Sequence, residues 1–360
     1  MSDPTSSDPV IIIGAGPAGL AAAETLAKRN IDYVILERGA AVASALRRVD
    51  PEMTLLSPKG LSLMPDMSPE PEAPTYMPFS VLVHELERYQ QQHQLKVNVD
   101  CTVLAIRKDE RGFVVRYRVR HGETRELRGS HVINATGIID NPRLPDNFHL
   151  LGGWRHSVDV RAQDLANAHR LLVVGGGASA AEVLETWLRV RQEGDRAWLS
   201  LRSKLRAIPH WIFGIDVHYF AWLPEHLPTR LFGSRVNRLT EPMTGRAVVR
   251  AIRKGLIKRV PRVRNYEYPE VEFENGEKID PDLIVFATGF DYAKEHLKEV
   301  VDFDQDGRAQ VTNCESTRVP GMFLLGFRFG RTFASPYLRG IARDAEFVAR
   351  RIAREKHGDK

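Results

Sequence analysis

The amino-acid sequence predicts an α/β protein with two parallel-sheet units, the second inserted into the first. Three observations carry this prediction. An apolar strand meets a GxGxxG turn and a helix near the start of the chain, and a similar strand, glycine turn and helix recurs in mid-chain. Two further apolar strands end in Ala-Thr-Gly, one before the second unit and one near its end.

The first glycine turn lies in VIIIGAGPAGLAAAETL, residues 10–26. Gly14 permits the tight turn, Gly16 lets the backbone approach a diphosphate, and Gly19 lets the helix pack closely on the strand. Free amides at the helix start then face the anion. A second strand ends at Glu37, near the spacing of about 20 residues expected for an acid that binds a ribose hydroxyl. We therefore predict a dinucleotide site at Gly14, Gly16, Pro17, Ala18, Gly19, Glu37 and Arg38.

The second glycine turn lies in LLVVGGGASAAEVLETWL, residues 171–188. The third glycine position holds Ala180, which the dinucleotide fingerprint tolerates. The next strand, AWLSLRS, ends in cations without an acid, as a site for a 2′-phosphate requires, so NADPH is favoured over NADH. The alternative is an exposed strand end that carries charges for solubility alone. The residues predicted for this site are Gly175, Gly177, Ala178, Ser179, Ala180, Arg202, Ser203 and Lys204.

The strands HVINATGI (131–138) and LIVFATGF (283–290) are matched crossing points between the two units. Their small residues let the chain leave a strand tightly beside a cofactor. After the second crossing, a strand ends at Gly326 and a last helix is expected over residues 335–352. We expect Thr136, Gly137, Thr288, Gly289 and Gly326 to contact the cofactors.

Two Rossmann-like dinucleotide-binding domains follow from these elements, the first of them discontinuous. The predicted bounds are 10–150 and 290–360 for the first domain and 151–289 for the second, after a disordered leader over residues 1–9.

Composition excludes several classes. The chain has 43% hydrophobic and 27% charged residues and a net charge of +5 without a dense basic block, so nucleic acid is not an expected partner. Two distant cysteines without CxxC predict neither a disulfide framework nor a thiolate cluster, and no metal is expected. No apolar segment reaches the length of a transmembrane helix, which predicts a cytoplasmic protein.

With these motifs in place, the chain resembles the flavin-containing monooxygenases, including the plant YUCCA-type enzymes. The resemblance rests on GAGPAG, Glu37, both Ala-Thr-Gly segments, GGGASA and the stretch RAIPHWIFGIDVHYFAWLP at 206–224. It implies FAD in the first domain and NADPH in the second. It also implies that NADPH reduces FAD and that oxygen adds at C4a, giving a C4a-hydroperoxyflavin that oxygenates a small organic substrate.

The family's linker motif corresponds to LLGGWRHSVDV, residues 150–160. Gly152 and His156 match it, whereas Leu150 and Val160 replace its aromatic ends. We expect His156 either to hydrogen-bond across the interface that holds the nicotinamide or to serve only the local turn.

Hydride transfer between cofactors needs no protein nucleophile, so catalytic residues are sparse. In the segment 53–65, Ser57 and Lys59 are candidate flavin-side contacts, the alternative being a surface loop. The rings of Trp211, Phe213, Tyr219, Phe220 and Trp222 line a substrate tunnel, form core, or cover a partner surface.

The leading functional hypothesis is an NADPH-dependent monooxygenase with a small substrate and molecular oxygen as partners. The rival is an NAD(P)H-dependent flavin reductase or oxidase, or a flavoprotein without CxxC that resembles bacillithiol disulfide reductases. The sequence leaves a homodimer open.

Overall fold

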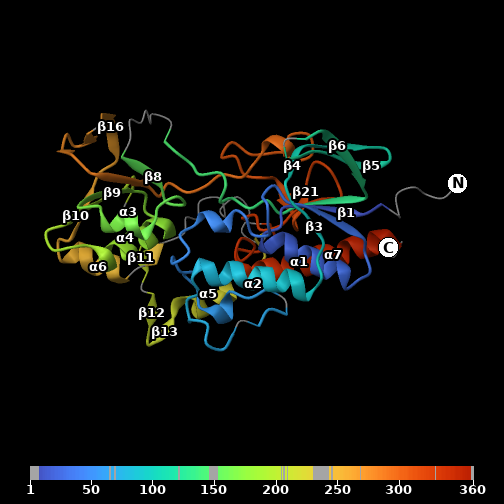
Figure 1. The fold of residues 1–360 in the computed structure, drawn as a ribbon, viewed down its shortest axis with the longest axis horizontal. Helices are drawn as coiled ribbons and strands as arrows, with labels where there is room; N and C mark the ends of the chain where they lie inside the picture. The colour runs from blue at the N-terminus through green and yellow to red at the C-terminus, as the bar shows by residue number, and fades with distance from the viewer. Residues whose placement is uncertain are drawn as a thin grey trace.

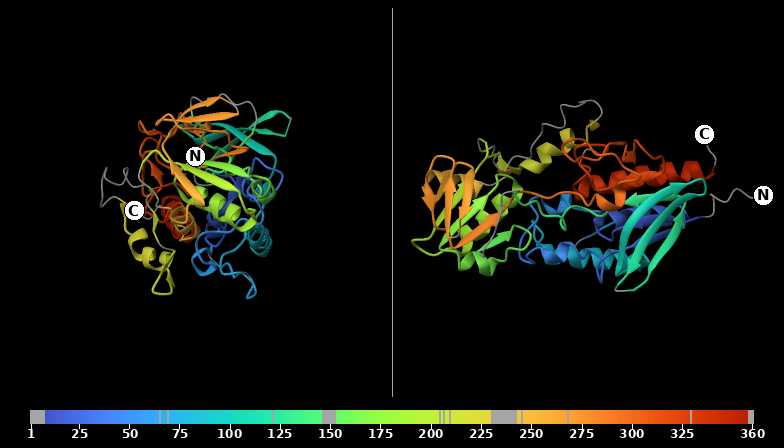
Figure 2. Two further views of the ribbon diagram at one scale, coloured as in Figure 1. Left: turned by 90° about the vertical axis from the view of Figure 1, so that its left-hand side faces the viewer. Right: turned by 90° about the horizontal axis from the view of Figure 1, so that it is seen from above.

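The computed structural model describes residues 8–357 except positions 65, 69, 121, 146–152, 204, 206, 209, 230–242, 245, 268 and 329. The molecule is elongated, with one lobe built from the mid-chain residues and the other from the two ends of the chain (Figures 1 and 2). Residues 1–7 of the predicted leader lie outside the described part of the chain.

A seven-stranded sheet forms the centre of the lobe that holds both chain ends. Its core strands β22, β7, β1, β2 and β3 are parallel, whereas β21 and β20 extend it in antiparallel fashion. Segments far apart in sequence therefore share one sheet. In spatial order its strands are β20 (Val311–Thr312), β21 (Glu315–Ser316), β22 (Met322–Leu324), β7 (His131–Asn134), β1 (Val10–Ile13), β2 (Tyr33–Leu36) and β3 (Val97–Asn98).

A five-stranded parallel sheet forms the centre of the mid-chain lobe. Its order repeats the parallel part of the larger sheet, with β9 in the place of β1 and β19 in the place of β7. In spatial order its strands are β15 (Ile257–Val260), β10 (Arg196–Ser200), β9 (Arg170–Val174), β19 (Leu283–Phe286) and β8 (Trp154–His156).

Each lobe also carries a three-stranded antiparallel sheet. In the first lobe it consists of β4 (Cys101–Asp109), β5 (Gly112–Val119) and β6 (Thr124–Gly129), and in the second of β16 (Val263–Glu267), β17 (Glu270–Phe273) and β18 (Lys278–Ile279). Two small pairs complete the strands: β11 (Ala207–Ile208) with β14 (Met243–Thr244), and β12 (Trp211–Ile212) with β13 (Ile215–Asp216).

The helices cover the parallel sheets with their apolar faces. In the first lobe, α1 packs against α7, whose Ala345, Val348, Ala349 and Ile352 are buried at helical spacing. In the second lobe, Trp187 of α4 is fully buried in the core. The helices are α1 (Pro17–Ala27), α2 (Phe79–Gln92), α3 (Ala162–Ala166), α4 (Ala178–Val190), α5 (Val217–Glu225), α6 (Arg246–Arg253) and α7 (Leu338–His357), with 3-10 turns η1 (Leu46–Arg48), η2 (Lys59–Leu61) and η4 (Glu295–Leu297).

The predicted fold class is confirmed, because two dinucleotide-type parallel sheets are present and the second lies within the sequence of the first. The final helix runs from Leu338 to His357 rather than over 335–352. The domain bounds 10–150, 151–289 and 290–360 stay predictions. Among the described residues, no helix is both long and apolar enough to cross a membrane.

Candidate functional site

The first glycine turn stacks directly on the first Ala-Thr-Gly segment. Gly14 has a φ of +99°, and a β-carbon there would lie 2.7 Å from the Ala135 carbonyl oxygen. A β-carbon on Gly19 would lie 1.9 Å from the Gly14 carbonyl oxygen. Both positions therefore require glycine, as the sequence predicts.

The start of α1 leaves room for an anion. Gly16 is the N-cap with extended backbone, no side chain caps the helix, and a β-carbon on Gly16 would meet no atom within 4 Å. Pro17 at the first helical position has no N–H, so the amides of Ala18 and Gly19 are the donors at this end. Uncapped amides facing open space fit a dinucleotide diphosphate.

Glu37 binds backbone amides of the same turn. Its Oε2 accepts a hydrogen bond from Ala15 N and its Oε1 accepts one from Gly39 N, each at 2.7 Å. Each carboxylate oxygen keeps one further lone pair for a ribose hydroxyl. The next residue, Arg38, forms an ion pair with Asp140, just after the first Ala-Thr-Gly segment.

The second glycine turn repeats this arrangement. Gly175 has a φ of +132°, and a β-carbon there would lie 2.1 Å from the carbonyl oxygen of Ala287 in the second Ala-Thr-Gly segment. Gly177 is an uncapped N-cap with open space before it, and Ala178 and Ser179 open α4. Ala180 is fully buried at the position equivalent to Gly19.

The end of β10 differs from the end of β2. The register with the central strand pairs Leu36 with Ile13 and Ser200 with Val174, so Leu201 stands where the first site has Glu37. Arg202 and Ser203 follow and are exposed. Lys204 lies outside the described residues. Cations without a carboxylate at this end suit a 2′-phosphate.

Both Ala-Thr-Gly segments are fixed by hydrogen bonds. The Thr136 hydroxyl accepts from the side-chain Nδ2 of Asn134 at 3.2 Å, and the side-chain Oδ1 of Asn134 lies 2.8 Å from His296 Nε2. Burial, and secondly the charge of Arg38, lower the pKa of His296 to about 4, so its imidazole is neutral. The Thr288 hydroxyl donates to the backbone carbonyl of Arg143. The backbone N–H of Arg143 in turn donates to the Gly289 carbonyl at 2.9 Å.

The three predicted contact glycines lie beside the two turns. A β-carbon on Gly137 or Gly289 would meet no atom within 4 Å, which leaves space beside each segment. Gly326 follows β22 with a φ of +77°, and a β-carbon there would lie 3.5 Å from the Ala18 side chain at the start of α1.

His156 contacts the second crossing point rather than open space. It is 1% exposed; its Nδ1 accepts from Val158 N at 3.3 Å, so its Nε2 donates to the Gly289 carbonyl at 3.1 Å. Burial lowers the pKa of this imidazole. Its ring packs edge-on against Phe290. His156 therefore positions the second Ala-Thr-Gly segment from β8.

Ser57 and Lys59 hold their own loop. The Ser57 hydroxyl lies 2.7 Å from the Ser62 hydroxyl, and Lys59 Nζ donates to the carbonyls of Pro71 and Ala73 at 3.0 and 2.6 Å. Their role as flavin contacts stays a prediction.

The two lobes are joined by ionic and polar contacts that the sequence analysis missed. Arg48 donates to Asp140 at 3.1 Å and to Asp159 at 2.8 Å, so it binds one carboxylate before β8 and one after it. Asp50 is buried and its Oδ2 accepts from Ala162 N at 2.6 Å. These pairs join residues 92 to 112 positions apart, so no local pattern predicts them.

A polar cluster around Asp216 was also missed. Asp216 is 2% exposed and accepts from Tyr76 OH at 2.5 Å, from His210 Nε2 at 3.0 Å, and from the Nδ1 and backbone N–H of His218 at 2.7 and 2.8 Å. The two imidazoles and the carboxylate are close enough to hold a metal ion. Four hydrogen bonds already fill the acceptor positions of the carboxylate, so the cluster is satisfied as it stands. That the protein uses no metal stays a prediction.

A second group that is close enough to hold a metal ion consists of Glu24, Asp66 and His93. The Lys28 ammonium already forms ion pairs with both carboxylates of this group.

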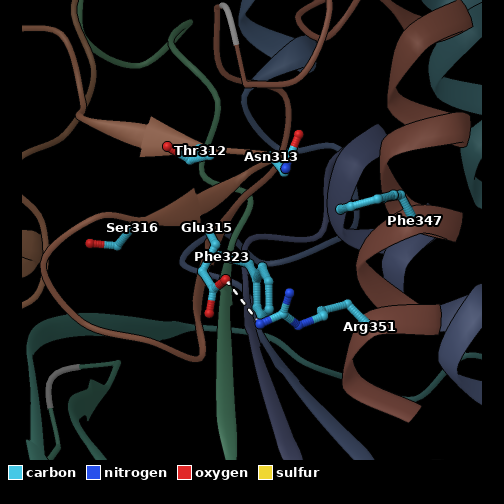
Figure 3. A pocket seen from close by; sticks show the side chains of 7 residues that line it. All are labelled: Thr312, Asn313, Glu315, Ser316, Phe323, Phe347 and Arg351. Carbon is cyan, nitrogen blue, oxygen red and sulfur yellow. Dashed lines mark ion pairs between the residues drawn. The ribbon is translucent and has the colours of Figure 1, made fainter. Parts of the chain in front are cut away.

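A cavity of about 170 Å³ lies between β20, β21 and α7 (Figure 3). Five of its seven lining residues are polar, and Glu315 and Arg351 form an ion pair at 3.7 Å within it. None of the glycine-turn residues lines it, so it is separate from the two dinucleotide sites.

The duplicated turns, each with an open helix start, define a two-dinucleotide oxidoreductase. Residues 11–202 match the family model of pyridine nucleotide-disulphide oxidoreductases, and the chain belongs to that family. Within it, the chain is a flavin-monooxygenase-like flavoprotein, as predicted. The oxidoreductase class, with FAD and NADPH as the cofactors of that class, is confirmed.

Curated relatives match over nearly the whole chain. The indole-3-pyruvate monooxygenase YUCCA1 of Oryza sativa subsp. japonica is 29% identical, over 95% of this chain and 90% of its own length. An uncharacterized CzcO-like oxidoreductase of Geobacillus kaustophilus is 25% identical, over 94% and 96%.

Solved structures share the fold. A flavin monooxygenase mutant from Stenotrophomonas maltophilia superposes with a TM-score of 0.77 at 24% identity, covering 97% of this chain and 98% of its own. The bacillithiol disulfide reductase Bdr of Bacillus cereus has a TM-score of 0.76 at 19% identity, with 97% and 99% covered. An ornithine N-hydroxylase of Kutzneria sp. 744, solved with reduced FAD, NADP⁺ and L-ornithine, has a TM-score of 0.75 at 17% identity, with 97% and 99% covered. At these identities the likeness concerns the fold alone.

Proposed function

We propose that this protein is an FAD-dependent, NADPH-consuming monooxygenase that acts on a small organic substrate. The observation that carries the proposal is the duplicated turn, in which each uncapped helix start lies beside its own Ala-Thr-Gly segment. When bound, FAD would take a hydride from NADPH and then react with molecular oxygen at C4a.

FAD is assigned to the first turn and NADPH to the second. At the first turn, Glu37 is already oriented by two amides, so its free lone pairs suit ribose hydroxyls. At the second, Arg202 and Ser203 are exposed and no carboxylate stands at the strand end, which suits the 2′-phosphate. The protein then contributes position and charge rather than a nucleophile.

Neutral imidazoles support oxygenation chemistry at the crossing points. His156 and His296 hold the two Ala-Thr-Gly segments, and burial lowers the pKa of each below its ordinary value. A buried imidazole that stays neutral donates one hydrogen bond without offering an acidic proton to the oxygen chemistry. Each is therefore a positioning residue in this proposal.

The monooxygenase relatives favour this function over the reductase or oxidase alternative. YUCCA1 is named for indole-3-pyruvate oxygenation, whereas the bacillithiol disulfide reductase is alike in fold only. The substrate of this chain follows from neither.

Rapid mixing separates the two functions. The flavoprotein is reduced anaerobically with NADPH, mixed with oxygen, and its visible spectrum is followed. A long-lived oxygen-dependent absorbance change supports the monooxygenase. Immediate reoxidation with one hydrogen peroxide released per NADPH overturns it in favour of the oxidase or reductase.

A further inference from the structure

An outward-facing aromatic surface is formed by eight residues within a short stretch of the chain. Among the described residues, eight of the nine large hydrophobic side chains that are exposed lie between positions 211 and 227. Soluble proteins rarely gather so many exposed apolar side chains in one place without a partner. The aromatic surface comprises Trp211, Phe213, Ile215, Tyr219, Phe220, Trp222, Leu223 and Leu227.

The local structure turns apolar side chains outward. Phe213 sits between β12 and β13 at the hairpin tip, is 97% exposed, and has a φ of +50°. It therefore belongs to neither a core nor a tunnel wall. Figure 1 shows the β12–β13 hairpin projecting from the body beside α5. On α5, Tyr219, Phe220 and Leu223 share one face by helical periodicity and are exposed, whereas only Val217 is buried.

This surface is anchored to the first lobe. Asp216 caps α5 and accepts a hydrogen bond from Tyr76. At the other end of α5, Glu225 pairs with Arg339 at 2.6 Å, and its carbonyl accepts from Ala334 N at 2.8 Å. The apolar side chains are thus presented by a fixed support, which reduces the entropy lost on docking.

The charges around the surface favour an anionic partner. Both acids within the stretch are neutralised, since Asp216 is buried among four donors and Glu225 is paired with Arg339. The exposed Arg343 lies 5.1 Å from the centre of the Trp222 ring. Lys59, whose Nζ donates to carbonyl oxygens, adjoins Gly60, where a β-carbon would lie 3.7 Å from Tyr219 OH. The whole chain is also cationic, at +5.

We propose that the aromatic surface docks on an anionic lipid bilayer, with the β12–β13 tip and the outer face of α5 in the interfacial region. Tryptophan, tyrosine, phenylalanine and leucine beside arginine and lysine are the composition of interfacial elements, and a projecting apolar tip needs only a fluid apolar phase. A second copy would have to offer an apolar socket for Phe213. The cavity near α7 is lined by five polar residues, including the ion pair of Glu315 and Arg351, and is a poor socket.

Vesicle flotation tests this proposal on the intact flavoprotein. Vesicles of pure phosphatidylcholine and of an equimolar mixture with phosphatidylglycerol are compared at low and high salt. We expect the protein to float with the mixed vesicles, to bind the neutral ones less, and to be released in part by salt. The double variant Phe213→Ser/Leu223→Ser should lower the bound fraction at least about tenfold, since two large apolar side chains are removed. Arg343→Glu should weaken binding to the mixed vesicles alone.

Val99→Ser is the matched control, because Val99 is the remaining exposed large hydrophobic side chain among the described residues and lies outside the stretch. It should bind as the unaltered protein does. Unchanged thermal unfolding of each variant, followed by circular dichroism, shows that the fold is retained. Flotation that is absent, or equal for the double variant and Val99→Ser, overturns the proposal. So does a wild-type protein that ignores vesicles but sediments as a dimer, which the double variant makes monomeric, because the surface is then a protein interface.

Discussion

The two dinucleotide turns share one backbone design and differ in a few side chains. In each, the first glycine of the turn lies against the carbonyl of the alanine in an Ala-Thr-Gly segment. A glycine is also the N-cap of the helix that follows, and no side chain caps that helix. Among the equivalent pairs of positions at which they differ are Gly19 and Ala180, Glu37 and Leu201, and Ala21 and Glu182.

Backbone contacts therefore decide where a diphosphate can bind, whereas the residues at the strand end decide which dinucleotide binds. At the third position of the fingerprint the first turn is the tighter one, since Gly19 admits no β-carbon while Ala180 is accommodated.

The largest effect is expected from Gly19→Ala, whose β-carbon would lie 1.9 Å from the Gly14 carbonyl oxygen. Relief requires a backbone shift, so we expect a loss of about 3 kcal/mol or more in the free energy of unfolding and purification without flavin. Urea unfolding and the visible absorbance measure this. Ala180→Gly, the matched change, should cost about 1 kcal/mol and leave the flavin bound. Equal losses for both variants would refute the asymmetry.

Glu37→Gln should weaken FAD binding about tenfold to a hundredfold. One of the amides of Ala15 and Gly39 would face an NH₂ group instead of a carboxylate oxygen, at a cost of about 1–3 kcal/mol. Titration of the apoprotein with FAD provides the measurement. Leu201→Gln at the matched position should leave FAD affinity unchanged. An unaltered FAD dissociation constant for Glu37→Gln would contradict the assigned role.

Arg202→Glu should lower the preference for NADPH over NADH about tenfold or more, because a carboxylate repels the 2′-phosphate. The ratio of kcat/KM for the two nucleotides in flavin reduction measures it. Arg38→Glu, at the matched position of the first turn, should not change that ratio, although it breaks the ion pair with Asp140. A preserved ratio in Arg202→Glu would remove the argument for NADPH at this strand end.

The smallest effect concerns Glu182 on α4, where α1 has the buried Ala21. Burial, and secondly the charge of Glu185, raise the pKa of Glu182 to about 8. The folded protein then holds a proton that the unfolded chain releases near pH 4.5, so stability is highest below that pH and falls as pH rises towards about 8. Glu182 is only half-buried, so solvent screens much of this pKa shift, and Glu182→Gln should gain about 1 kcal/mol in unfolding free energy at about pH 9 and almost nothing at about pH 4. Parallel pH profiles for variant and wild type would show that Glu182 does not titrate in this range.

Local patterns predicted the parts of the site that depend on local sterics. Gly14, Gly19 and Gly175 are required by contacts within one turn or with an adjacent strand, and such positions leave a fingerprint. Glu37 was found by spacing, but its two amide partners became visible only in the fold. Two hydrogen bonds escaped prediction, that of Tyr76 to Asp216 and that of Ala162 N to Asp50. Each joins segments far apart in the chain, and residues of these types occur in many different environments.

The aromatic stretch at residues 206–224 shows a further limit of prediction from sequence. Its composition predicted a tunnel, a core or a partner surface, and composition cannot distinguish these because each is rich in rings. The 97% exposure of Phe213 depends on the direction in which the β12–β13 hairpin projects, and the 68% exposure of Leu223 depends on which face α5 turns toward the first lobe.

By itself the sequence determined two glycine turns, two Ala-Thr-Gly crossings and an acid at the end of one strand only, because steric limits on a turn act between near neighbours. Tertiary structure alone decided that His156 and His296 hold the two crossings, that Arg48 binds the carboxylates before and after β8, and that α5 faces outward. Those outcomes depend on packing between segments far apart in the chain, and packing selects partners by shape and burial that no local spacing records.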